Sequence, residues 1–165
     1  MKLPPYNTFP AIVSDKIILR QVLESDLKDI LEIQYYDGKA AATEAEAKTM
    51  LDKIDQNYID GDSIHWGIAD KITNQLVGTL GYYRGFEKRT GELGCVLLPA
   101  FRGKGYMIMA MELAVDFGIK EIQLQRIVAI TTTENEAAIK LLGRLGFIKT
   151  INLEDNSIEF EYRGK

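Results

Sequence analysis

The stretch LLPAFRGKGYMIMAMELAVDFG, Leu97–Gly118, decides how the chain must fold. It opens as the end of an apolar strand, turns at Pro99, and passes through Arg-Gly-Lys-Gly (102–105) into a methionine-rich run that predicts a helix over 104–119. Glycine permits positive φ and close approach of the backbone to a ligand, and a helix N-terminus carries partial positive charge. The turn therefore suits an anion such as a diphosphate. The alternative is a plain strand-to-helix connection with two solvated cations.

Around this stretch, the hydrophobic patterns predict one mixed α/β domain over residues 1–165, with its core at about 15–163. The expected strands are 16–22, 63–70, 75–84, 91–99, 126–132, 147–153 and 157–164, and the expected helices are 24–36, 43–61, 104–119 and 135–145. Short hairpin turns indicate a mostly antiparallel central sheet flanked by helices. The helix 104–119 crosses from the fourth strand to the fifth, so it makes them parallel neighbours and starts at their carboxyl ends, where α/β proteins bind ligands.

The first two helices carry start signals of their own. Ser25 or Asp26 is expected to cap the first helix, and Thr43 is expected to cap the second. The segment DGKAAA (37–42) between them is expected to form a turn.

Composition and charge exclude several classes of function. The formal charge of −4 argues against nucleic-acid binding by bulk charge. Cys95 is the one cysteine, so we expect no disulfide and interpret it as a buried structural thiol. His65 is the one histidine, which argues against a metal site and a Ser-His-Asp triad. We expect His65 to be structural, with a place in a binding cleft as the alternative.

The N-terminal segment MKLPPYNTFP lacks the apolar core of a signal peptide, and no apolar run is long enough to span a membrane. We therefore expect a cytoplasmic protein without a membrane partner.

Two nucleotide-binding motifs fail at the glycine turn. A P-loop needs a glycine at position 98, where Leu98 stands, and Ser or Thr after the lysine, where Gly105 stands. A dinucleotide fingerprint needs a third glycine at the position of Ile108. A generic nucleotide-binding domain is thereby disfavoured.

The segment LLPAFRGKGYM resembles the acyl-CoA loop of the GCN5-related N-acetyltransferase (GNAT) family, whose pattern is [QR]-x-x-G-x-[GA]. Arg102 and Gly105 match this pattern, while Met107 replaces the final small residue. The segments IILRQVLESD, GELGCVLLP and TTTENEAAIKLLGRLGF resemble other parts of the family in the same order, and the branch is similar to the ribosomal-protein-alanine acetyltransferases. The resemblance implies the GNAT fold, with the fourth and fifth strands splayed, and acetyl-CoA as donor to a primary amine, without a metal.

The resemblance also implies where coenzyme A binds. The pantetheine arm would pair with the fourth strand as another strand would, and the diphosphate would sit on the backbone amides of the turn. Asn135 would reach the pantetheine arm from the opposite wall, and it is also a candidate N-cap of the helix 135–145; the two roles are compatible. The cofactor-binding residues so implied are Val96, Leu97, Arg102, Gly103, Lys104, Gly105, Tyr106, Met107 and Asn135.

Acyl transfer from a thioester to an amine needs a neutral amine, a donor to the developing oxyanion, and an exit for the thiolate. By the resemblance, Glu92 is the candidate base, and the alternative is a solvent-facing residue after a hairpin. The candidate oxyanion donor is a backbone amide of the fourth strand, at Leu97 or Val96.

The chain departs from the family pattern at the residue that would act as the general acid and protonate the leaving thiolate. Relatives carry Tyr or Ser where this chain has Leu142 and Ala138, and neither side chain can donate a proton. A thiol with a pKa near 8.5 can leave as a thiolate, so the loss is expected to cost about 100-fold in rate. The absent acid also favours the alternative function, a weakly catalytic or non-catalytic acyl-CoA-binding regulatory protein.

The acceptor is expected to bind near Tyr35 and Tyr36, in the loop between the first two helices, where relatives receive it. A peptide or protein N-terminal α-amine is the predicted acceptor, with small amines as the alternative. Whether the protein is a monomer or a homodimer stays open.

Overall fold

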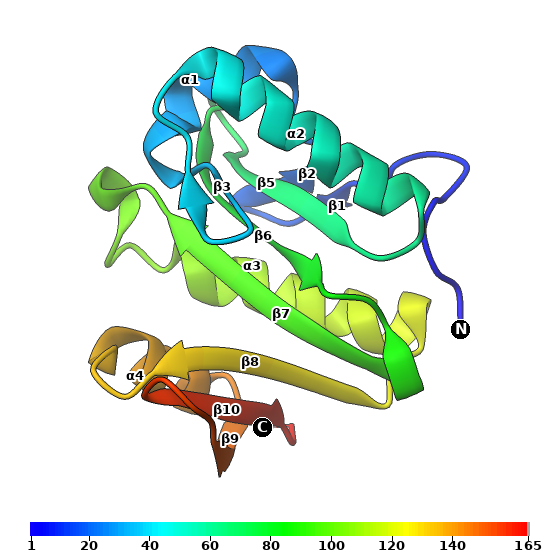
Figure 1. The fold of residues 1–165 in the computed structure, drawn as a ribbon, viewed down its shortest axis with the longest axis vertical. Helices are drawn as coiled ribbons and strands as arrows, with labels where there is room; N and C mark the ends of the chain where they lie inside the picture. Colours follow the sequence, from blue (N-terminus) through cyan, green and yellow to red (C-terminus); the bar gives the residue numbers. More distant parts are fainter. Residues whose placement is uncertain (165) are drawn as a thin grey trace.

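A twisted sheet of eight strands runs through the molecule in the order β1-β2-β5-β6-β7-β8-β10-β9 (Figure 1). The structure, a computed structural model, describes residues 1–164. The strands are β1 (Ile12–Val13), β2 (Ile17–Arg20), β5 (Ile64–Asp70), β6 (Leu76–Tyr83), β7 (Thr90–Leu97), β8 (Arg126–Thr132), β9 (Phe147–Asn152) and β10 (Ser157–Tyr162). The pair β7–β8 is parallel and the other neighbours are antiparallel, which confirms the predicted mixed sheet.

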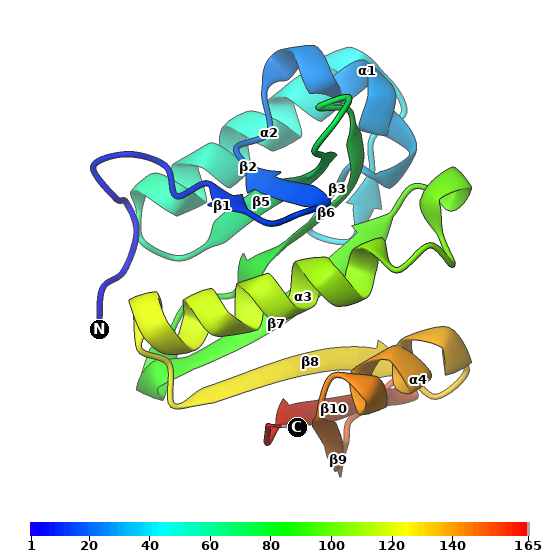
Figure 2. The same ribbon diagram turned by 180° about the vertical axis from the view of Figure 1, so that it is seen from behind.

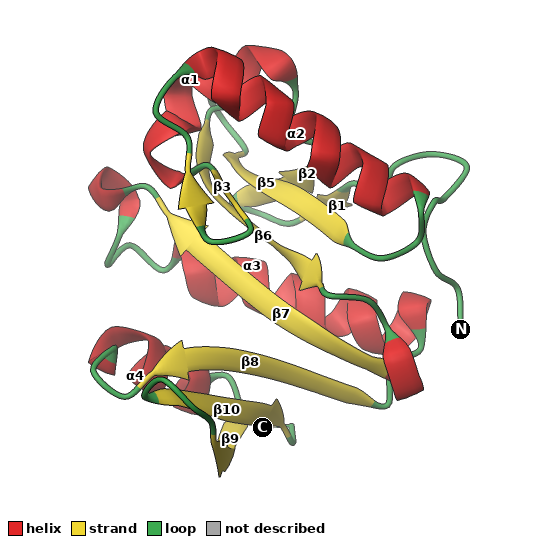
Figure 3. Ribbon diagram, in the orientation of Figure 1, coloured by secondary structure: helices red, strands yellow, loops and turns green. Residues whose placement is uncertain are grey.

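Helices cover both faces of this sheet (Figures 2 and 3). The helices are α1 (Leu27–Ile30), α2 (Glu44–Ile59), α3 (Tyr106–Phe117) and α4 (Glu136–Arg144). Helices α1 and α2 lie on one face, and α3 and α4 lie on the other. Alternation along the strands sends Trp66 and Tyr82 into the core under α3, while Ala69 joins Leu27 and Leu51 in the core under α1 and α2. The chain thus has one core on each side of the sheet.

The predicted splay of the fourth and fifth strands is present. Strands β7 and β8 pair at Thr90↔Arg126, Gly91↔Ile127 and Glu92↔Val128, and then they diverge (Figure 1). From residue 93 onward, β7 keeps its antiparallel partner β6 on the other side. Backbone groups of β7 that point toward β8 therefore lack a strand partner along this half of β7.

The predicted helix 24–36 is wrong in its second half. The segment 24–33 forms a 3-10 turn, the short helix α1 and a second 3-10 turn, and the chain then enters β3 (Tyr35–Tyr36) and β4 (Lys39–Ala40). These two strands form a separate two-stranded sheet, so Tyr35 and Tyr36 belong to a hairpin and not to a loop. Its turn residues, Asp37 and Gly38, both have positive φ, as a tight two-residue hairpin turn requires.

Other predicted boundaries hold closely. Thr43 caps α2, since its hydroxyl accepts the Glu46 amide at 3.2 Å. Helix α3 begins at Tyr106, two residues later than predicted, because Gly105 has a left-handed φ of 82°. Within residues 1–164, no helix is both long and apolar enough to cross a membrane.

Candidate functional site

The glycine turn leaves open space in front of α3. Gly103 and Gly105 have φ of +73° and +82°, and a Cβ built on either would meet nothing within 4 Å. No side chain caps α3 among the described residues 1–164, so the N–H groups of its first turn are directed at this space. An anion placed there would face several unpaired amides and the positive end of a 12-residue helix. The turn therefore fits a diphosphate.

The polar side chains at the turn contact other parts of the chain. Arg102 reaches back to the Leu97 carbonyl at 3.4 Å, and the Lys104 ammonium lies over the Phe101 ring. The Tyr106 hydroxyl donates to Asp70 at 3.0 Å, a bond that raises the pKa of Tyr106. Tyr106 is therefore available to an anion only through its backbone N–H.

The backbone of β7 presents alternate residues to the gap beside β8. The Leu98 amide donates to the Val77 carbonyl of β6 at 2.9 Å. In an antiparallel pair the N–H and C=O groups of every second residue point to the same partner, so Val96 also faces β6. Leu97 and Cys95 face the gap instead. This alternation favours Leu97 as a backbone donor and corrects the expectation for the Val96 amide.

Cys95 is exposed, so the expectation of a buried structural thiol is wrong. Its sulfur lies 3.6 Å from that of Met111 on α3. The residue is exposed, but its sulfur is packed against protein atoms. The resulting desolvation raises the pKa of the thiol to about 12.

Asn135 caps α4 at the carboxyl end of β8. Its Oδ1 accepts the Ala138 amide at 3.1 Å, which confirms the structural role. The residue is exposed and lies where β8 ends and α4 begins. Leu142, at the position of the absent acid, is buried in the core.

The cap gives a prediction for Asn135→Ala. Loss of the cap is expected to lower the free energy of unfolding by about 1 kcal/mol, and loss of a ligand bond to weaken acetyl-CoA binding by about 1–2 kcal/mol. Denaturant unfolding and calorimetric titration measure the two effects. Thr43→Ala, which removes the matching cap of α2, is the control and should change stability alone. A stability change without an affinity change in Asn135→Ala would mean that Asn135 is only a cap.

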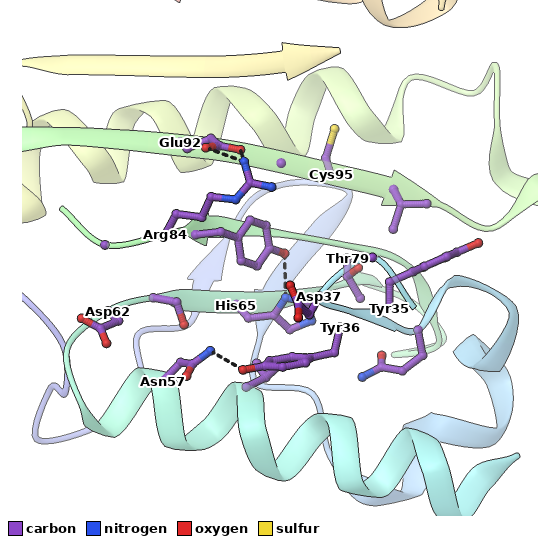
Figure 4. A pocket seen from close by; sticks show the side chains of 18 of the residues that line it. Tyr35, Tyr36, Asp37, Asn57, Asp62, His65, Thr79, Arg84, Glu92 and Cys95 are labelled. Carbon is purple, nitrogen blue, oxygen red and sulfur yellow. Dashed lines mark hydrogen bonds and ion pairs between the residues drawn. The ribbon is translucent and has the colours of Figure 1, made fainter. Parts of the chain in front are cut away.

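A cavity of about 1000 Å³ opens on the α2 face of the sheet (Figure 4). Its walls come from the β3–β4 hairpin, α2 and the strands β5, β6 and β7. The predicted site residues Tyr35, Tyr36, Glu92 and Val96 all line it. The structure therefore brings the candidate base and the candidate acceptor residues to one cavity.

The cavity is acidic. Asp37, Asp62, Glu87 and Glu92 line it, while Arg84 is the one cation among its described lining residues. One Arg84 nitrogen lies 2.8 and 3.1 Å from the two carboxylate oxygens of Glu92, as Figure 4 shows. Carboxylates in this excess favour a cationic ligand.

His65 and Tyr83 form a pair at the floor of the cavity. The Tyr83 hydroxyl lies 2.7 Å from Nδ1 of His65 (Figure 4). The Tyr83 ring packs on two glycines, because a Cβ would lie 3.0 Å from it at Gly81 and 3.1 Å at Gly94. Burial lowers the pKa of His65 to about 4, so the imidazole is neutral at pH 7.

Sequence reasoning missed Tyr83 as a site residue. The alternation of side chains along a strand could have indicated it, because Tyr82 and Tyr83 must point to opposite faces of β6. The Tyr82 hydroxyl donates to the Ala114 carbonyl of α3 at 2.9 Å, whereas Tyr83 faces the cavity. For His65, the cleft alternative is the one that the structure supports.

Comparisons with known proteins agree with this arrangement. The family model described as "Acetyltransferase (GNAT) domain" matches residues 16–148. The uncharacterized N-acetyltransferase YoaA of Bacillus subtilis (strain 168) is 30% identical over 149 residues, which cover 86% of this chain and 84% of the relative. The spermidine N(1)-acetyltransferase of Escherichia coli (strain K12) is 36% identical over 59 residues, 36% of this chain and 32% of the relative.

The fold has a solved counterpart in the ribosomal-protein-S5-alanine acetyltransferase of Vibrio fischeri. The TM-score is 0.75 at 21% identity, and the match covers 94% of this chain and 97% of that chain. The splayed strands, the open glycine turn and the family model all lead to one conclusion. The chain belongs to the GNAT family of N-acetyltransferases.

Proposed function

We propose that the protein binds acetyl-CoA in the gap between β7 and β8, binds a primary amine in the acidic cavity, and transfers the acetyl group directly between them. The observation that carries this proposal is that β7 serves both sites. Its residues Leu97 and Cys95 present backbone groups to the gap, while Glu92 and Val96 line the cavity. One strand thus separates the two substrates.

Acetyl-CoA supplies a thioester, an acyl group activated for attack by an amine. The Glu92 carboxylate would accept a proton as the amine nitrogen bonds to the acyl carbon, and the Leu97 N–H would donate to the acyl oxygen. The carbon–sulfur bond then breaks, and the electron pair leaves on sulfur. Because Ala138 and Leu142 cannot donate, water would protonate the thiolate. The products are the acetylated amine and coenzyme A.

The acceptor that we propose is the N-terminal α-amine of a peptide or protein. An α-amine has a pKa near 8, against about 10.4 for lysine, so its neutral fraction at pH 7.5 is more than about 100-fold larger. A site with one carboxylate base and no acid side chain at residues 138 and 142 gains most from an amine that is already neutral.

The peptide proposal predicts a large difference in rate between two classes of amine. Short peptides with a free, small N-terminal residue should be acetylated faster than the same peptides blocked at the N-terminus and carrying lysine. Release of free thiol, corrected for rates with each substrate omitted, measures both. Equal or reversed rates would remove the α-amine preference.

A polyamine is the second candidate acceptor. Four carboxylates line the cavity, and part of the chain is similar to a spermidine N(1)-acetyltransferase. Spermidine therefore belongs in the same assay as a third substrate. Coenzyme A binding without turnover on any amine would instead support the regulatory alternative.

A further inference from the structure

Two nitrogen atoms beside the acceptor cavity are buried without a hydrogen-bond partner among the described residues 1–164. They are Nε2 of Gln34 and Nε2 of His65, and both residues line the cavity. Gln34 is only 2% exposed, although it is polar. A buried polar group without a partner destabilises the folded state, so two such groups on one cavity need an explanation.

The His65–Tyr83 pair fixes which kind of group His65 offers. A neutral imidazole carries one N–H. Within the part of the chain that the structure describes, Nδ1 of His65 is the one partner of the Tyr83 hydroxyl, at 2.7 Å. If Nδ1 carried the hydrogen, the hydroxyl hydrogen of Tyr83 would also be unpaired. Donation from Tyr83 to Nδ1 leaves fewer unpaired groups, and it places the hydrogen on Nε2.

Both unpartnered nitrogens are then donors. An amide NH₂ group donates, and so does the Nε2–H of this tautomer. An ammonium group on the acceptor brings only further N–H donors and would leave both nitrogens unpaired. A carbonyl oxygen on the acceptor would pair with them.

The β3–β4 hairpin forms one wall of the cavity, and Gln34 lies at the start of this hairpin. Gln34 immediately precedes β3, and its carbonyl accepts the Ala41 amide at 2.9 Å, which closes the hairpin. The hairpin is a separate two-stranded sheet, so a small shift of it breaks no pair of the main sheet. The proposed subsite requires such a shift, because both nitrogens are buried.

We infer that Gln34 and the His65–Tyr83 pair form a carbonyl-binding subsite, so the acceptor carries a carbonyl oxygen next to its amine. This inference rests on the proposed function and narrows it. The acidic walls would attract the amine into the cavity, and the two donors would bind the carbonyl. A free amino acid is disfavoured, because its carboxylate would meet the acidic walls. Peptide N-termini and amino-acid amides carry both features.

The test uses two probes that differ at the carbonyl. Alaninamide has the amine and the carbonyl, and 1,2-diaminopropane has the same carbon skeleton with a methylene in place of the carbonyl. We expect a higher kcat/KM for alaninamide. His65→Leu should raise the KM for alaninamide about tenfold, the loss of one hydrogen bond, and change that for 1,2-diaminopropane less than about twofold.

Matched variants separate binding from structure. Tyr83→Phe keeps His65 but removes the hydroxyl that holds the imidazole hydrogen on Nε2. It should therefore raise the alaninamide KM by less than His65→Leu does. Tyr82→Phe removes a buried hydroxyl on the opposite face of the same strand. It should lower the melting temperature and leave the ratio of the two KM values unchanged. Equal effects of His65→Leu on both probes would overturn the inference.

A second measurement does not depend on turnover. His65 is the one histidine in the chain, so ¹⁵N-histidine labelling gives a single imidazole spectrum. At pH 7 with coenzyme A bound, we expect the hydrogen on Nε2 and a shift of Nε2 when alaninamide, but not 1,2-diaminopropane, is added. A shift without acetylation would remove the proposed function and keep the subsite. Acetylation without a shift would remove the subsite.

Discussion

Gly105→Asp is expected to weaken acetyl-CoA binding at least 100-fold while the fold persists. The new carboxylate would stand in the open space in front of α3, beside the place proposed for the diphosphate. Two negative charges about 4 Å apart repel by about 4 kcal/mol at the effective dielectric constant of a protein surface, which is more than 100-fold in affinity. Aspartate tolerates a left-handed φ better than most residues and caps helices well, so α3 should still form.

Calorimetric titration with acetyl-CoA measures this loss, and circular dichroism checks the fold. The matched control is Gly38→Asp, which also has positive φ (+75°) and nothing within 4 Å of a Cβ, but lies in the β3–β4 turn. It should bind acetyl-CoA as the unmodified protein does. Wild-type affinity in Gly105→Asp would remove the diphosphate from the glycine turn.

Glu92→Gln is expected to lower kcat about 100-fold or more with little change in acetyl-CoA affinity. Glutamine keeps the shape of the side chain and can still accept a hydrogen bond from Arg84, but it cannot take the proton of the amine. Because Glu92 lines the cavity and not the gap, the donor site is left intact. Steady-state kinetics at saturating acetyl-CoA and a separate binding titration measure the two quantities.

Arg84→Gln is the control for the ion pair itself. It removes the partner at 2.8 Å and keeps the carboxylate, and the Arg84 side chain is 74% exposed, so the fold should tolerate the change. A large loss of kcat in Glu92→Gln but not in Arg84→Gln would assign the effect to the base. Unchanged turnover in Glu92→Gln would assign deprotonation to water or to another residue.

The sequence predicts those elements whose structure depends on neighbouring residues. Thr43 and the amphipathic run after it predicted α2, and the alternating strands with the crossover helix predicted the neighbours β7 and β8. The segment after Asp26 was not predictable in this way. There the helical segment ends at Ile33, and the chain reverses at Asp37 and Gly38, which both have positive φ.

The candidate site also has parts that local sequence predicts and parts that depend on contacts between distant residues. Glycine spacing predicted the open turn before α3, because glycine adopts a positive φ most readily. The His65–Tyr83 pair could not be found, since 18 positions separate the two residues and only the register of β5 on β6 brings them together. The point at which β8 leaves β7, after the pair Glu92↔Val128, is likewise encoded by no local pattern.

The position of β7 between the gap and the cavity has a consequence for the order in which substrates bind and products leave. If both substrates bind as proposed, each has a separate entrance to its site, one beside β8 and the other beneath α2. Neither has to enter before the other, and an acetylated product need not pass the spent coenzyme on its way out. A large folded protein could offer only its chain end at the cavity mouth, while the rest of its bulk stays clear of the nucleotide.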